Sequence, residues 1–229
     1  MDIQHCYSES GTGDVLILLH GNGENSEYFT YQIDAFSEHY RVIALDTRGH
    51  GKTQRGTAPF TLEQLADDLY GFMTEHSIRK AHILGFSDGG NIALLFALKH
   101  PYMVDKLILN GADLNTNGVK ASIQIPIEFG YRIVSLISHF DKKAVAKKEM
   151  LGLMVGQPDI KPEALHELRI PSLVIVRTDD MIKDKHSRLI ADSIPGCRFV
   201  AISGDHFIAV KNSEPFNREV LKFLSEDSL

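Results

Sequence analysis

Short runs of consecutive apolar residues recur along the chain, and each is followed by a polar or glycine-rich segment. Their length is typical of β-strands. Their lack of polar–apolar alternation is typical of strands buried on both faces, as in a mostly parallel sheet covered by helices. The predicted strands are residues 15–20, 41–46, 81–86, 106–111, 172–178 and 198–203. A weaker extended stretch, residues 3–8, is expected to pair with residues 15–20 as a hairpin arm.

Longer segments between these runs show the spacing of apolar residues that is typical of helices. The predicted helices are residues 28–38, 62–76, 89–99, 185–193 and 215–224. The start of the second helix is well marked, because Thr61 can cap it and Gln64 follows three residues later, as in a capping box. This alternation predicts a doubly wound α/β fold, formed by a single domain over residues 1–229.

One segment, from Asp113 to about His166, carries no strand signal. It contains two amphipathic stretches, residues 123–140 and 142–154, so we expect a small helical insertion at about residues 114–166 over one edge of the sheet. Its Met and aromatic side chains more often belong to a core, yet as a group they are the best candidates to line an apolar substrate pocket. They are Phe129, Tyr131, Phe140, Met150 and Met154.

Composition and charge narrow the class of protein. Of the 229 residues, 43% are hydrophobic and 24% are charged, which is ordinary for a folded globular chain. Lys and Arg together number 24 and Asp and Glu 30, so the net charge is −6 and nucleic acid is not expected as a partner. No apolar run approaches the roughly 20 residues needed to cross a bilayer, and we expect no membrane association.

Two further absences in the sequence point to the cytoplasm. The N-terminus lacks the apolar stretch of a signal peptide. The two cysteines, Cys6 and Cys197, form neither a disulfide framework nor a cluster of metal ligands. The expected location is therefore cytoplasmic, and no metal is expected.

The most specific motif is G-F-S-D-G-G at residues 85–90, between a predicted strand and a predicted helix. It fits the G-x-S-x-G pattern of a nucleophile elbow. There the strand turns abruptly into the helix, so Ser87 takes a strained conformation, and only small residues two positions away permit the close backbone approach. The helix N-terminus would also supply the N–H of Asp88 to a developing oxyanion. Ser87 is therefore the candidate nucleophile.

With these motifs the chain resembles the α/β-hydrolase family over nearly its whole length. The resemblance also rests on H-G-N-G at residues 20–23, after the first core strand, and on D-T-R-G-H-G at residues 46–51, after the next. It implies an eight-stranded sheet, a cap inserted after the sixth strand and a Ser–His–Asp triad. The insertion at residues 114–166 falls where the family places its cap.

The serine needs a base within hydrogen-bond reach, and a carboxylate must orient that base. His206 is the candidate base, because it follows the predicted strand 198–203 at the carboxyl edge of the sheet, where Ser87 is also expected. Gly204 gives this loop the freedom to bring the imidazole over Ser87. His20 lies near the site as well, and we expect it to brace its loop through hydrogen bonds.

Asp180 is the preferred candidate for the triad acid. Asp179 and Asp180 both follow a predicted strand, and only one of them can point at His206, because side chains alternate between faces. In the family the acid stands three residues after a small residue that ends the strand. Arg177 occupies that place here instead of the usual glycine, and the count gives Asp180. Asp179 is an alternative, and so is Asp113, which follows the sixth strand, where some relatives carry their acid.

The oxyanion hole requires two N–H donors, and the resemblance implies the backbone amides of Asn22 and Asp88. The Asp88 side chain allows two interpretations. An acid in the first turn of a helix is stabilised by the helix dipole. A carboxylate beside the nucleophile also favours a cationic group such as an ammonium, and some relatives with an S-D-G-G elbow act on amino-acid-type esters. The loop at residues 46–51 is expected to brace the rim of the site through an Asp–Arg or an Arg–backbone contact.

The predicted function is that of a serine hydrolase, in the first place a carboxylesterase that cleaves a small or medium ester through an acyl-enzyme, with no cofactor. The same triad supports C–C bond cleavage, lactone opening or peroxidase chemistry, and a likeness of fold does not choose among them. A ligand-binding receptor on this scaffold is the alternative from a different class. The expected partner is a small ester-like molecule, and both a monomer and a homodimer are compatible with the sequence.

Overall fold

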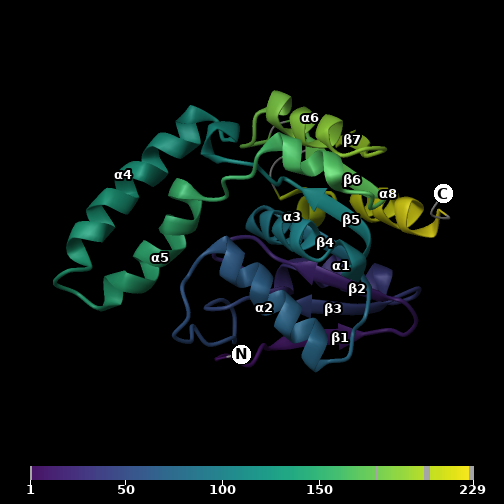
Figure 1. The fold of residues 1–229 in the computed structure, drawn as a ribbon, viewed down its shortest axis with the longest axis horizontal. Coiled ribbons are helices and arrows are strands. Elements are labelled where there is room, and N and C mark those ends of the chain that lie inside the picture. Colours follow the sequence, from purple (N-terminus) through teal and green to yellow (C-terminus); the bar gives the residue numbers. More distant parts are fainter. Residues whose placement is uncertain (1, 179, 204–206, 227–229) are drawn as a thin grey trace.

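The computed structural model describes residues 2–178, 180–203 and 207–226, which form a mostly parallel sheet between helices (Figure 1). The strands are β1 (Tyr7–Ser10), β2 (Val15–Leu19), β3 (Arg41–Leu45), β4 (Ala81–Phe86), β5 (Val104–Asn110), β6 (Ser172–Arg177) and β7 (Arg198–Ile202). Their order across the sheet is β1-β3-β2-β4-β5-β6-β7, and all neighbours are parallel except β1 and β3. The doubly wound α/β fold is confirmed.

Two details of the predicted sheet are wrong. The described residues form seven strands and not eight, since the first residues of the chain are held by a loop and do not add a strand: the Asp2 carboxylate accepts hydrogen bonds from the Ala58 N–H at 2.9 Å and from Arg48. The N-terminal strand β1 also pairs with β3, whereas we expected a hairpin with β2. Both edges of β2 are already occupied by the parallel strands β3 and β4.

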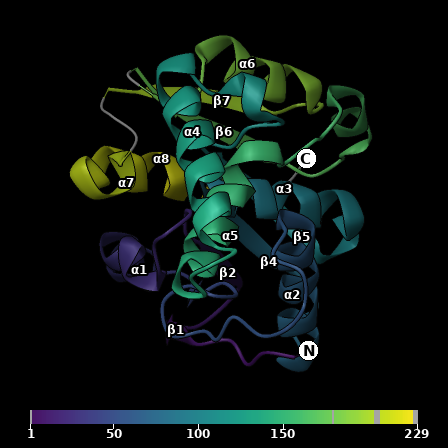
Figure 2. The same cartoon turned by 90° about the vertical axis from the view of Figure 1, so that its left-hand side faces the viewer.

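Helices cover both faces of the sheet (Figure 2). One face packs against α2 (Leu62–Glu75), α3 (Asp88–Lys99) and α6 (Asp184–Ser193), and the other against α1 (Thr30–Phe36), α7 (Ile208–Lys211) and α8 (Ser213–Ser225). The described residues also include four 3₁₀ turns: η1 (Ser26–Phe29), η2 (Pro101–Met103), η3 (Thr116–Gly118) and η4 (Pro162–Glu167). The continuous apolar strands are buried because each face carries its own helical layer.

The predicted start of α2 is confirmed, because the Thr61 hydroxyl accepts the Gln64 N–H at 3.1 Å. The reciprocal half of the capping box is replaced by another contact. The Gln64 side chain donates to Asp68 Oδ1 at 3.0 Å, so it supports a buried carboxylate and does not return to the cap.

Between β5 and β6 the chain leaves the sheet and forms a pair of helices, α4 (Ala121–Ile137) and α5 (Lys143–Gly156), which we call the cap hairpin. Its helices pack mainly on each other and extend away from the sheet (Figure 1). Across the described residues, no helix is both long and apolar enough to cross a bilayer.

Candidate active site

Ser87 lies at a strained turn between β4 and α3, as the motif predicts. Its backbone has φ +53° and ψ −122°, a conformation that L-residues rarely adopt. A Cβ on Gly85 would lie 2.2 Å from the Gly89 carbonyl oxygen, and a Cβ on Gly89 would lie 2.0 Å from the Leu19 carbonyl oxygen. The two glycines are therefore required by close backbone packing, and Ser87 is held in place by its surroundings.

The sheet topology brings the loop at residues 20–23 beside Ser87. Strand β2 is followed by β3 on one side, and the chain then crosses to β4 on the other side, so the order of strands reverses between β2 and β4. Leu19 is in register with Gly85, and the loops that follow these strands leave the sheet at the same edge. Such a reversal is where ligands bind in open α/β sheets.

A small cavity of about 20 Å³ lies over Ser87, between the sheet and the cap hairpin. Its lining comes from the elbow, the end of β5, the cap hairpin and the segment after β6, and it consists of Ser87, Asp88, Asp113, Thr116, Val119, Gln124, Met154, Gln157, Met181 and Ile182. This volume holds a water molecule or two. Gln124 and Met154 place the cap hairpin directly on this cavity.

Two carboxyl groups of this cavity are buried. Burial raises the pKa of Asp88 to about 6, and the nearby Asn22 amide lowers it only in part. Burial also raises the pKa of Asp113 to about 7, with a smaller opposing effect from the Asn91 amide, which donates to Asp113 Oδ1 at 3.0 Å. Asn91 accepts the Asp113 N–H in return at 2.8 Å, so this carboxyl group is fixed on α3.

Gln124 adds a third acceptor to the cavity. Its Nε2 donates to Glu128 Oε1 and to the Met154 carbonyl oxygen, both at 3.1 Å, so the orientation of the amide is set by two acceptors. Its Oε1 is then directed away from them, and it has no hydrogen-bond partner among the described residues. The same holds for Asp88 Oδ2. Sequence reasoning missed both Gln124 and Asn91, because neither lies in a motif.

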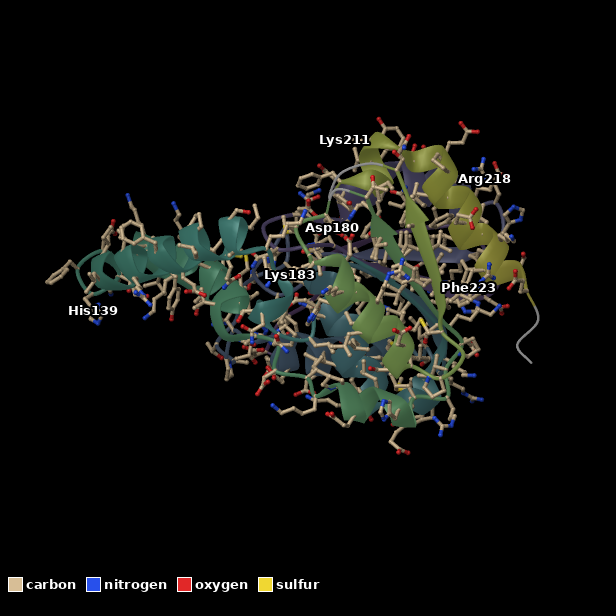
Figure 3. The ribbon with its side chains drawn as sticks, turned by 90° about the horizontal axis from the view of Figure 1, so that it is seen from above. His139, Asp180, Lys183, Lys211, Arg218 and Phe223 are labelled. Atoms are coloured by element: carbon tan, nitrogen blue, oxygen red, sulfur yellow. The ribbon has the colours of Figure 1, made fainter. Side chains whose placement is uncertain are left out.

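Asp180, labelled in Figure 3, is buried after β6 and directly precedes Met181 and Ile182, which line the cavity. Its Oδ1 accepts the Ile182 N–H at 3.2 Å, and its Oδ2 accepts a hydrogen bond from the Arg177 guanidinium. The arginine favours the charged form of this carboxylate, which is the form a triad acid needs. Asp113 is instead held by the neutral Asn91 amide, and its pKa is raised. Asp179 and the candidate base His206 lie outside the described residues.

The loop at residues 20–23 is braced from several sides. His20 is buried, its Nδ1 lies 2.7 Å from the Gly21 carbonyl oxygen, and its Nε2 accepts the Thr47 N–H at 3.1 Å, which requires the neutral tautomer protonated at Nδ1. Burial lowers the pKa of His20 to about 4, in keeping with that role. The Asn22 side chain donates to the Met150 carbonyl oxygen of α5 at 2.8 Å, so it connects this loop to the cap hairpin.

The loop at residues 46–51 is held by an arginine, as expected, although not through Asp46. Arg48 is buried and forms ion pairs with Asp68 of α2 at 2.6 Å and with Asp2, and it donates to the Arg55 carbonyl oxygen at 3.1 Å. Asp46 instead accepts backbone N–H groups from Ser26 and Lys52.

The apolar residues expected to line a pocket separate into different environments. Met154 lines the cavity, whereas Phe129 in α4 and Phe140 just after α4 are 65% and 95% exposed. His139, close to Phe140, lies at the far tip in Figure 3. Among the described residues, no group of three His, Cys, Asp or Glu side chains is placed to hold a metal ion.

Comparison with known proteins agrees with this fold. The family model of the alpha/beta hydrolase fold matches residues 14–131, and the chain belongs to that family. A Caulobacter protein provisionally named carbamate hydrolase RutD is 30% identical to it, over 93% of this chain and 91% of the relative.

Two further similarities describe the range of the family. A Burkholderia vietnamiensis protein named 2-hydroxy-6-oxononadienedioate/2-hydroxy-6-oxononatrienedioate hydrolase is 32% identical over 73% of this chain and 59% of its own length. The solved structure of an enol-lactonase from Burkholderia xenovorans superposes with a TM-score of 0.82, at 21% identity, over 98% of this chain and 97% of that chain. The structural likeness shows a shared fold.

Proposed function

We propose that the protein is a serine hydrolase that cleaves an acyl compound, in the first place a small or medium carboxylic ester, through an acyl-enzyme at Ser87. The observation that carries this proposal is the position of Ser87, which is held at φ +53° at the N-terminus of α3 and lines a cavity beneath the cap hairpin. Family membership and the hydrolase names of the relatives support the reaction class.

In the proposed mechanism the Ser87 hydroxyl attacks the carbonyl carbon while His206 accepts its proton. Asp180 holds the imidazole in its productive tautomer and stabilises the imidazolium. The backbone N–H groups of Asn22 and Asp88 receive the oxyanion, and the first N–H groups of a helix are available for this because they have no partner within the helix. The leaving alcohol takes the proton from His206, and a water molecule activated by His206 then releases the acid.

The cavity also supports a preference for substrates that carry N–H donors. Asp88 Oδ2 and Gln124 Oε1 are buried acceptors without a partner among the described residues, and the Asp113 carboxyl lies in the same cavity. Buried acceptors without donors are costly, so a ligand that supplies N–H groups is favoured. An ammonium group or an unsubstituted amide nitrogen meets this requirement, and the name of the Caulobacter relative, a carbamate hydrolase, is compatible with it.

The nucleophile is tested with an alkyl fluorophosphonate probe and a series of p-nitrophenyl esters of graded length. We expect labelling at Ser87, located by peptide mass spectrometry, and a loss of turnover of about 10⁴-fold or more in Ser87→Ala. Wild-type protein that is folded but is not labelled would support a receptor without an activated serine. A Ser87→Ala variant with full activity would exclude Ser87 as the nucleophile.

The preference for N–H donors is tested by Asp88→Asn with matched esters that do and do not carry an amine. We expect a selective loss of kcat/KM on the amine-bearing esters, by about 10-fold or more if the contact is charge-assisted. Because the pKa of Asp88 is raised to about 6, the wild-type preference should grow as the pH rises from 5 to 7. An equal loss on neutral esters would remove the preference while leaving the serine hydrolase proposal in place.

Hydrolysis of carbamates is the second candidate function, because the acceptor-rich cavity suits a carbamate nitrogen. Comparing a p-nitrophenyl ester with the carbamate of the same leaving group, in wild type and in Gln124→Met, separates the two. If carbamates are preferred, Gln124→Met should reduce kcat/KM on the carbamate more than on the ester.

A further inference from the structure

A buried arginine contacts the candidate triad acid. Arg177 ends β6 and is 1% exposed, at the position where the family likeness leads us to expect a glycine. Its Nη2 donates to Oδ2 of Asp180, and its Nη1 donates to Asn110 Oδ1 at 3.2 Å. Because the desolvation of both charges offsets their attraction, a buried ion pair is weak support for stability alone. The Arg177–Asp180 ion pair includes the candidate triad acid, which indicates a role in the site.

The strand ends around Arg177 are arranged to hold its guanidinium. Gly111 has φ +72°, and a Cβ there would lie 2.5 Å from Nη2 of Arg177. The guanidinium carbon also lies 6.0 Å from the centre of the Phe86 ring, which directly precedes Ser87. Arg177 therefore fills a space that a glycine in β6 would leave open and that a side chain at position 111 would close.

The same contacts connect Arg177 with the nucleophile. Asn110 accepts from Arg177 through its side-chain oxygen, and it accepts the Ser87 N–H through its carbonyl oxygen at 2.8 Å. One residue at the end of β5 thus joins the arginine to the turn that holds Ser87. A displacement of the guanidinium would therefore affect both the Asp180 carboxylate and the turn at Ser87.

We propose that Arg177 is a positioning residue of the triad, which fixes the Asp180 carboxylate and makes the His206 imidazole less basic. This inference rests on the proposed function, with Asp180 as the acid and His206 as the base. Arg177 donates to Oδ2 of Asp180, so the guanidinium holds one side of the carboxylate. The Ile182 N–H, which donates to Oδ1, orients it.

The direction of the charge effect follows from electrostatics. The positive guanidinium reduces the attraction of the Asp180 carboxylate for an imidazolium, so the base stays unprotonated to a lower pH than it would beside an isolated carboxylate. Removing the positive charge should therefore move the acidic limb of activity to a higher pH. The other titratable groups that line the described part of the site are Asp88 of α3 and Asp113 after β5, and both are unchanged in the variants below.

The test measures the rate of fluorophosphonate labelling of Ser87 between pH 4.5 and 9, which needs no knowledge of the substrate. We expect the midpoint of the acidic limb to rise by about one pH unit in Arg177→Met. It should return toward the wild-type value in Arg177→Lys, which keeps the charge but not the planar fork of donors. Arg48→Met is the matched control, since Arg48 is equally buried and its ion pairs are with Asp68 and Asp2, not with the candidate triad acid.

The outcomes separate this inference from the proposed function. A folded Arg177→Met protein with an unmoved midpoint overturns the role of Arg177, and so does an equal shift in Arg48→Met. Where Arg177→Met does not fold, Arg177→Gln keeps a donor for Asp180 without the charge and must show the same shift. Wild-type protein that is never labelled at Ser87 contradicts the proposed function itself.

Discussion

The ionisation of the buried Asp113 carboxyl group should change the free energy of unfolding with pH. Burial raises its pKa from 3.8 to about 7, and the Asp88 carboxyl adds to the shift. Because the pKa is higher in the folded state, the unfolded chain ionises first as the pH rises from about 4 to 7, and the folded state loses stability over that window. At full ionisation the loss is roughly 4 kcal/mol.

Asp113→Asn should remove this loss, since an amide oxygen can still accept from Asn91. We expect the variant to match wild type in free energy of unfolding at pH 4 and to exceed it at pH 8 by about 2–4 kcal/mol, measured by urea denaturation. A difference that does not change with pH would show that burial does not perturb this carboxyl group.

Individual residues of the site differ in how readily they can be predicted from the sequence. Ser87 can be predicted because a strand, a serine between two glycines and a helix form one local pattern, and the steric reason is visible in the contacts of Gly85 and Gly89. Gln124 and Asn91 give no such signal. The contact of Gln124 with Met154 depends on how α4 packs on α5, and the contact of Asn91 with Asp113 depends on how α3 meets the segment after β5. The partner of Arg177 could not be predicted either, although its presence in place of a glycine was a visible departure.

At the scale of elements, the helices and strands with strong patterns lie close to their predicted ranges, and the errors concern pairing. The run at residues 15–20 carries no information on which strand lies beside it. The N-terminal strand was assigned to the nearer neighbour in sequence, and it pairs with β3. A Cβ on Gly11, in the turn after β1, would lie 2.2 Å from the Tyr40 carbonyl oxygen, so this turn passes over the start of β3.

The glycines of the strand–helix junction give a prediction about elements. Gly89→Ala places a methyl group 2.0 Å from the Leu19 carbonyl oxygen, where backbone cannot yield, so we expect loss of the folded state or a destabilisation above about 4 kcal/mol. Gly130→Ala in α4 is the control, because its Cβ would meet nothing closer than 3.9 Å. It should leave stability unchanged or raise it by up to about 1 kcal/mol. Thermal unfolding of both variants measures the contrast, and similar melting temperatures would contradict the steric account.

At the scale of the whole molecule, the cap hairpin is the part of the site that the sequence predicts only in part. The sequence predicted an inserted helical segment, and its place between β5 and β6 follows from the missing strand signal alone. The direction in which α4 and α5 leave the sheet could not be predicted, because both helices carry apolar residues on more than one side, several of which are exposed. The cap hairpin contributes Gln124 and Met154 to the lining of the cavity over Ser87.

One polar contact between the cap hairpin and the sheet layer offers a test of substrate access. Arg55, in the loop after β3, forms a partly exposed ion pair with Glu149 of α5 at 2.7 Å. Because Gln124 and Met154 of the cap hairpin line the cavity over Ser87, weakening this contact should favour a more open arrangement and increase the apparent affinity for long substrates. Such an ion pair contributes about 0.2–1 kcal/mol, so Glu149→Gln should raise kcat/KM on long-chain esters by up to about 5-fold while kcat/KM on short esters changes little.

The control is Glu9→Gln, which removes a similarly exposed ion pair with Arg41 at the far edge of the sheet. It should change kcat/KM on neither long nor short esters. Equal effects of Glu149→Gln on short and long esters would mean that the cap hairpin does not limit access.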